Sequence, residues 1–113
     1  MTESIYARMR DKPRFTVNFK AKYSMKEQAA QQQECLITNL SASGATVRFP
    51  NTEIISKRIP VVIDIPIPNT IMHVSAAAEI VWVKQRFNRL ISGVRFSNIL
   101  SDTMLQKLTE KST

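Results

Sequence analysis

The feature that most constrains the fold of this chain is the alternation of apolar and polar residues along short segments. In residues 14–24, every second residue from Phe15 to Tyr23 is apolar and the residues between them are polar. A period of two is typical of a β-strand with one face in a core and the other in solvent. Strand character returns in residues 34–38, 45–49, 61–67, 72–84 and 90–96. The chain therefore predicts a mainly β fold with six antiparallel strands.

The ends of this pattern add a helix and a closed sheet. Pro66 and Pro68 either end the fourth strand or confine it to an edge. After the sixth strand the period changes, because Ser101 is a suitable helix N-cap and apolar residues then recur at helical spacing. Closure of the sheet removes exposed strand edges, which a small domain can hardly cover otherwise. We therefore expect a small antiparallel six-stranded, closed or split β-barrel with a C-terminal α-helix that packs on it or plugs it.

A length of 113 residues suits one domain with one core. We assign residues 14–113 to the barrel and its helix, and residues 1–13 to a flexible basic arm. The sequence contains neither a secretory signal nor eighteen consecutive apolar residues, so we expect a cytoplasmic protein without membrane insertion.

The sequence shows few of the features that are typical of an enzyme. Paired carboxylates, a metal-ligand cluster and a glycine-rich phosphate loop are all missing from the sequence, and Cys35 and His73 are the only cysteine and histidine. We expect Cys35, within an apolar run, to be a buried thiol in a reducing compartment. We therefore predict no catalytic residue, no metal site and no cofactor, and classify the chain as a non-enzyme.

The net charge of +7 favours anionic partners. Positive charge gathers near the amino terminus, at Arg8, Arg10, Lys12 and Arg14. Pro13 disfavours helical geometry at the preceding residue, so this arm is extended or turning. Guanidinium groups on it can pair with two phosphate oxygens or with O6 and N7 of guanine.

A second motif, Asn39-Leu40-Ser41-Ala42-Ser43-Gly44, lies where the second strand turns into the third. Asn39 both donates and accepts hydrogen bonds, Ser41 offers a hydroxyl, and Gly44 permits a positive φ or a close backbone approach. The same residue types also form ordinary hairpin turns, so the turn indicates a ligand site only together with the arginines.

In order and strand context the two motifs resemble the PilZ domain family, whose signature is Arg-x-x-x-Arg followed by Asp/Asn-x-Ser-x-x-Gly. Gly93-Val94-Arg95-Phe96 before the terminal helix is also similar to the family. The resemblance implies binding of the bacterial second messenger cyclic di-GMP through Arg10, Arg14, Asn39, Ser41 and Gly44. It further implies a signal passed by conformational change to a protein partner, in control of motility, biofilm, virulence or pilus assembly.

Five secondary candidates accompany these residues: Arg8, Lys12, Ser43, Trp82 and Arg95. An indole near a nucleotide can stack on a base, although the alternation of Trp82 with Ile80 and Ala78 favours burial in the core. Arg95 is expected to face solvent opposite Val94 and Phe96.

Two other readings stay open. One is a PilZ-fold adaptor that contacts proteins and binds no nucleotide. The other is a basic β-barrel that binds RNA or single-stranded DNA, which a low aromatic content of 7% makes less favourable. A homodimer is also compatible with the sequence.

Overall fold

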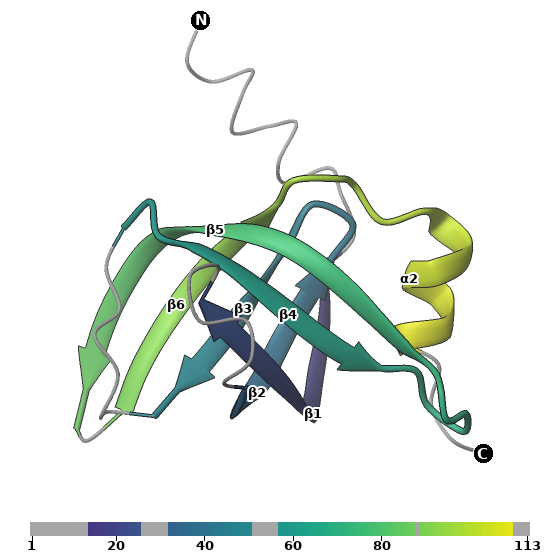
Figure 1. Cartoon of the computed structure of the whole chain (residues 1–113), viewed down its shortest axis with the longest axis horizontal. Helices are drawn as coiled ribbons and strands as arrows, with labels where there is room; N and C mark the ends of the chain where they lie inside the picture. The colour runs from purple at the N-terminus through teal and green to yellow at the C-terminus, as the bar shows by residue number, and fades with distance from the viewer. Residues whose placement is uncertain (1–13, 26–31, 51–56, 88, 110–113) are drawn as a thin grey trace, which may run out of the picture.

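Six antiparallel strands close into a barrel in the computed structural model, which describes residues 14–25, 32–50, 57–87 and 89–109 (Figure 1). The elements are β1 (Arg14–Met25), β2 (Gln33–Ser41), β3 (Gly44–Phe49), β4 (Pro60–Pro66), β5 (His73–Arg86), β6 (Arg89–Phe96) and helix α2 (Asp102–Thr109). The strand order around the barrel is β1-β2-β3-β6-β5-β4. The predicted mainly β fold, with a closed six-stranded barrel and a C-terminal helix, is confirmed.

Two three-stranded meanders, β1-β2-β3 and β4-β5-β6, join along two seams to close this barrel. One seam pairs β3 with β6, from Gly44 opposite Arg95 to Phe49 opposite Leu90. The other pairs the end of β1 with β4, where Lys22 lies opposite Asp64. Because β4 has a neighbour on each side, it is not an edge strand, and it ends at Pro66.

Alternate residues of all six strands point inward and form one hydrophobic core. Ile37, Ile63 and Ile80 have no exposed surface, and the Tyr23 and Phe49 rings meet edge to face with centroids 4.7 Å apart. Complete burial of a side chain of this size contributes about 1.5–3 kcal/mol. Phe15 lies opposite the buried Leu40 but is 38% exposed and lies outside the core cluster, so its predicted core position is wrong.

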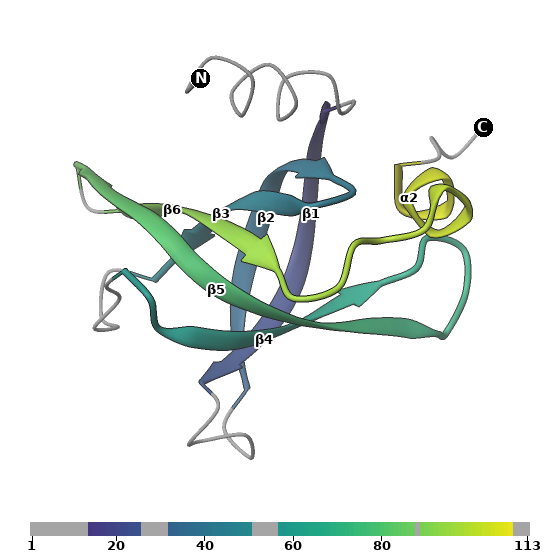
Figure 2. The ribbon, with the colours of Figure 1, turned by 90° about the horizontal axis from the view of Figure 1, so that it is seen from above.

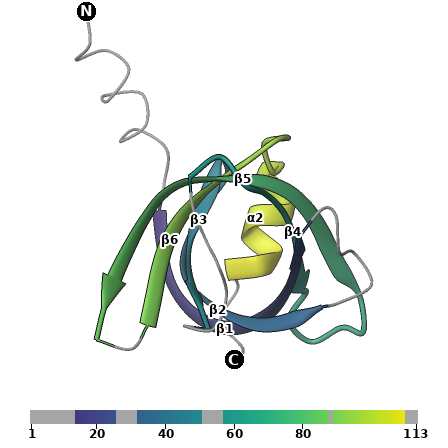
Figure 3. The ribbon, with the colours of Figure 1, turned by 60° about the vertical axis from the view of Figure 1, so that its left-hand side comes forward.

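Helix α2 covers one end of the barrel. Its first turn is capped as predicted, because the Ser101 hydroxyl accepts a hydrogen bond from the Met104 amide at 3.1 Å. Leu105 and Leu108 are buried within the barrel core, and Figure 3 shows the helix across the opening of the strand ring. At the opposite end, the turn between β5 and β6 projects away from the helix (Figures 1 and 2). No helix in the described part of the chain is long and apolar enough to span a bilayer.

Candidate functional site

The predicted site residues that the structure describes lie on the outer surface of the barrel, along two adjacent rows that cross five strands. In the first row, Arg14 lies opposite Ser41, and Gly44 lies opposite Arg95, which in turn lies opposite Glu79. The second row runs through Thr16, Asn39, Thr46, Gly93 and Trp82. Residues that are far apart in sequence thus converge on one surface because the β3–β6 seam joins the two meanders.

Three irregularities in the strand ladders adjoin this second row. The register shifts between Thr16 and Phe19 in β1, between Ile37 and Asn39 in β2, and between Ile80 and Trp82 in β5. An extra residue in one strand bends it and turns a side chain to a new direction, and such bulges occur often beside binding sites. The barrel is therefore least regular where the candidate residues gather.

The turn that follows β2 is short and firmly held. Asn39 belongs to β2, so the prediction that places it within the turn is wrong, and the turn itself consists of Ala42 and Ser43. The Ala42 carbonyl accepts a hydrogen bond from the Leu100 amide, and the Ser43 carbonyl accepts one from the Phe96 amide, both at 2.8 Å. These bonds tie the turn to the segment that leaves β6, which fixes the floor of the site.

Gly44 is needed for a close approach of two backbones, as one of its two predicted roles states. A Cβ at this position would lie 2.2 Å from the Val94 carbonyl oxygen. Its φ is not positive, because the described glycines include none with a positive φ. The Ser41 hydroxyl donates to the Gly44 carbonyl at 3.3 Å and lies 3.4 Å from the Ser43 hydroxyl, so both serines line the same small surface.

Two arginines and an amide supply the polar groups of the site. Arg14 is exposed and has no ion pair with any described residue. Arg95 faces solvent as predicted, and its guanidinium lies 3.5 Å from the Glu79 carboxylate. The half-buried Asn39 amide forms no hydrogen bond within the described segments, so its donor and acceptor are both available.

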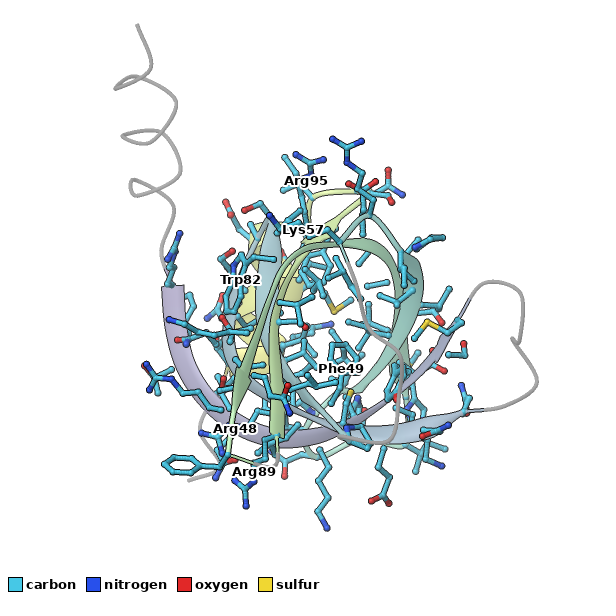
Figure 4. All side chains as sticks on the ribbon, turned by 90° about the vertical axis from the view of Figure 1, so that its left-hand side faces the viewer. Arg48, Phe49, Lys57, Trp82, Arg89 and Arg95 are labelled. Carbon is cyan, nitrogen blue, oxygen red and sulfur yellow. The ribbon has the colours of Figure 1, made fainter. Side chains whose placement is uncertain are left out.

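Trp82 lies outside the barrel, and its predicted burial in the core is wrong. The register shift after Ile80 places Val81 and Trp82 both at the surface, 37% and 40% exposed. The indole then packs over Gly93, where an added Cβ would lie 2.0 Å from Nε1. Figure 4 shows Trp82 and Arg95 on the outside of the ring of strands. The bulge thus turns the Trp82 side chain outward, where the indole lies beside the polar groups of the site.

Together these side chains border an open groove with a volume of about 790 Å³. Its lining includes Arg14, Asn39, Ser41, Ser43, Gly44, Trp82 and Arg95. Ligand pockets in proteins typically measure about 300–1,000 Å³. The groove is therefore large enough for a nucleotide ligand.

The lining also includes residues that the sequence analysis does not single out as site residues, among them Thr46, Val81, Gly93 and Ile99. The outward position of Thr46 in its strand and the scarcity of glycine could have indicated Thr46 and Gly93. Three predicted residues, Arg8, Arg10 and Lys12, lie outside the described residues, as does the whole proposed arm of residues 1–13.

Cys35 is buried with 6% of its surface exposed, in agreement with the sequence. Burial raises the pKa of this thiol to about 12. At neutral pH it is therefore protonated, and a protonated thiol is a poor nucleophile. Within the described residues, no three His, Cys, Asp or Glu side chains lie close enough together to hold a metal ion.

The fold and the groove define a class of protein: a small six-stranded β-barrel with an open groove across its outer face, bordered by two arginines, an amide and an indole. The chain belongs to the PilZ domain family, whose family model, described as PilZ domain, matches residues 8–111. This confirms the resemblance drawn from the two motifs. No curated protein matches the chain by sequence.

Thirteen chains of solved structures are similar to this one. Bacillus subtilis inhibitor of motility (MotI/DgrA) has a TM-score of 0.65 and 14% identity over 87% of this chain and 47% of that chain. The PilZ domain of CeSA from a cellulose-synthesizing bacterium has a TM-score of 0.60 and 13% identity, covering 85% and 94%. Borreliella burgdorferi PlzA in complex with c-di-GMP has a TM-score of 0.57 and 14% identity, covering 94% and 43%. The chain thus spans about half the length of MotI and of PlzA, and these likenesses show the shared fold.

Proposed function

We propose that this chain is a receptor for cyclic di-GMP that binds the nucleotide in the groove and signals to a protein partner. The observation that carries this proposal is the convergence of Arg14, Asn39, Ser41 and Arg95 around one groove beside an exposed indole. Membership of the PilZ family supports it, and one structural relative, PlzA, is in complex with this nucleotide.

The chemistry of the groove suits a ligand with two guanines and two phosphates. The Arg14 guanidinium can pair with phosphate oxygens or with the O6 and N7 acceptors of guanine. The Asn39 amide can meet a guanine edge, and Ser41 or Ser43 can donate to a phosphate. Trp82 offers its face to a purine. Arg10, which completes the Arg-x-x-x-Arg motif, would add a second guanidinium from the amino-terminal arm.

The output of such a receptor is a change in shape. We propose that the arm closes over the bound nucleotide and so alters a surface that a protein effector recognises. MotI is named an inhibitor of motility, and control of motility is accordingly the first process to examine, ahead of biofilm, virulence and pilus assembly. The receptor acts in the cytoplasm, as a monomer or a homodimer, and performs no reaction.

Trp82 provides the experiment, because it is the only tryptophan in the chain and borders the groove. Titration with cyclic di-GMP is expected to change its fluorescence with saturation, whereas GMP and cyclic di-AMP are not. Arg14→Ala is expected to weaken binding by about tenfold to a hundredfold, since hydrogen bonds to charged groups contribute about 1.5–3 kcal/mol. Lys22→Ala removes one positive charge from the same strand, outside the groove lining, and is the matched control.

Thermal unfolding gives a second readout. A ligand present at a hundredfold excess over its dissociation constant adds about 2.7 kcal/mol of stability. Absence of both the fluorescence change and the thermal shift at millimolar nucleotide would contradict the proposal and favour the adaptor reading. Binding of single-stranded nucleic acid that weakens steeply with salt would instead favour the nucleic-acid reading.

A further inference from the structure

The turn between β5 and β6 carries an aromatic residue where folding alone would not favour one. Arg86 pairs with Arg89, so only two residues connect the strands, and the first of them, Phe87, is 96% exposed with a φ of 54°. Positive φ at this position is favourable for glycine or asparagine and unusual for a bulky residue. Neither burial nor backbone geometry explains Phe87, so its ring is available for something outside this chain.

Four cationic residues lie near Phe87, on the strands of its hairpin and on the neighbouring strand. Lys84, Arg86 and Arg89 lie on the last residues of the hairpin, and Arg48 lies on the neighbouring strand opposite Ile91. Figure 4, which views the barrel from its hairpin end, shows Arg48 and Arg89 on the same side, and both border one shallow groove. None of these four cations forms an ion pair within the described segments of the chain. We call Phe87 and these four residues the hairpin tip.

We propose that the hairpin tip docks the protein on the anionic surface of a lipid bilayer, with the Phe87 ring at the boundary between the headgroups and the acyl chains. An aromatic ring flanked by long basic side chains suits this boundary, because the ring enters the acyl border while the cations stay at the phosphates. No segment crosses the bilayer in this arrangement.

The shape of the hairpin tip favours a bilayer over a protein. A stable protein interface buries about 800 Å² on each partner, which needs a broad surface, whereas the hairpin tip is centred on one short turn that projects from one end of the barrel (Figures 1 and 2). A bilayer needs no complementary pocket for the ring. A bilayer bound at the hairpin tip also leaves the groove uncovered. The Trp82 and Gly93 pair lies four register positions, about 13 Å, from the Arg86 and Arg89 pair.

Co-sedimentation of the full chain with vesicles tests this proposal without any nucleotide. We expect binding to vesicles of equal phosphatidylcholine and phosphatidylglycerol that weakens with salt, and little binding to pure phosphatidylcholine. Phe87→Asn is the decisive variant, because asparagine tolerates the positive φ and should not lower the melting temperature. Its partition coefficient is expected to fall about tenfold, since the ring no longer leaves water.

Two matched controls separate the tip from general properties of the chain. Ile71, 95% exposed on the β4–β5 connection at the other end of the barrel, is changed to serine to match the loss of apolar surface. Lys22→Glu on β1 makes the same change in net charge as Lys84→Glu at the tip. We expect both controls to bind like wild type and Lys84→Glu to bind at least about fivefold less.

Three results would overturn the proposal. The first is a failure of wild type to bind either vesicle, which would turn attention to an acidic protein surface as the partner of the tip. The second is unchanged binding by Phe87→Asn. The third is equal loss in Lys22→Glu and Lys84→Glu, which would mean that net charge alone attracts the protein to lipid.

Discussion

Gly44 and Gly93 lie on the same face of the barrel and should respond very differently to alanine. At Gly44 the new methyl group would meet the Val94 carbonyl, which belongs to the β3–β6 seam and cannot move without separating two strands. Overpacking against fixed atoms costs about 1–3 kcal/mol. At about 4 °C for each kcal/mol, Gly44→Ala should lower the melting temperature by about 4–12 °C.

At Gly93 the three atoms nearest to the new methyl group all belong to the Trp82 side chain, with Nε1 at 2.0 Å. That indole is 40% exposed and can swing into solvent. We therefore expect Gly93→Ala to cost less than about 1 kcal/mol, because only the contact of an exposed ring is lost. The displaced indole should show a red-shifted emission, and cyclic di-GMP should bind less tightly because the stacking surface has moved.

Thermal unfolding followed by circular dichroism measures both variants, and Trp82→Ala provides the internal control. With the indole removed, Gly93→Ala should become neutral or slightly stabilising, because alanine restricts the unfolded chain more than glycine does. The two substitutions should therefore be strongly non-additive. If Gly93→Ala cost as much as Gly44→Ala, and cost the same with Trp82 absent, the packing described for the indole would be wrong.

Three further predictions concern single groups. Ser92→Ala should raise the free energy of unfolding by about 1 kcal/mol, because the buried Ser92 hydroxyl lacks a hydrogen-bond partner among the described residues. The urea midpoint should therefore rise, and a lower midpoint would contradict this. Burial raises the pKa of Cys35 from 9.0 to about 12, so above pH 9 the unfolded chain releases this proton first and the free energy of unfolding falls as pH rises toward 12. That fall should be smaller in Cys35→Ala, and an identical pH dependence would refute the assignment. Glu79→Gln frees the Arg95 guanidinium and should tighten cyclic di-GMP binding about twofold to fivefold in the Trp82 titration, whereas weaker binding would exclude Arg95 as a ligand contact.

Hydrophobic periodicity predicted the six strands, from a period of two, and the terminal helix, from helical spacing after the Ser101 N-cap, because the burial of one face determines which residues are apolar. The same rule failed at Trp82, where it predicts a core residue. One extra residue after Ile80 reverses the inside and outside of the strand from that point on. No particular residue type marks a bulge in the sequence. Its position depends on the neighbouring strand and is fixed only in the closed barrel.

The candidate site was predictable to the extent that it rests on residue types. Arg14, Asn39, Ser41 and Gly44 share one groove, and the sequence could group them because they belong to two motifs that resemble the PilZ signature. The sequence could not predict the packing of the indole over Gly93 or the pairing of Arg95 with Glu79. Both contacts depend on which strands become neighbours, and that is a property of the completed topology.

The seam between β3 and β6 also has a consequence for biosynthesis. While the ribosome releases the chain, the first meander emerges with β3 as an open edge, and its partner follows only after nearly half of the chain has been added. Pairing of such distant segments is slow, because the intervening chain must first lose its freedom. Gly44 gains its neighbour Arg95, and Asn39 and Trp82 come to line the same groove, only once this pairing is complete. Under the proposed function, nascent chains would therefore not bind cyclic di-GMP, and only completed barrels would do so.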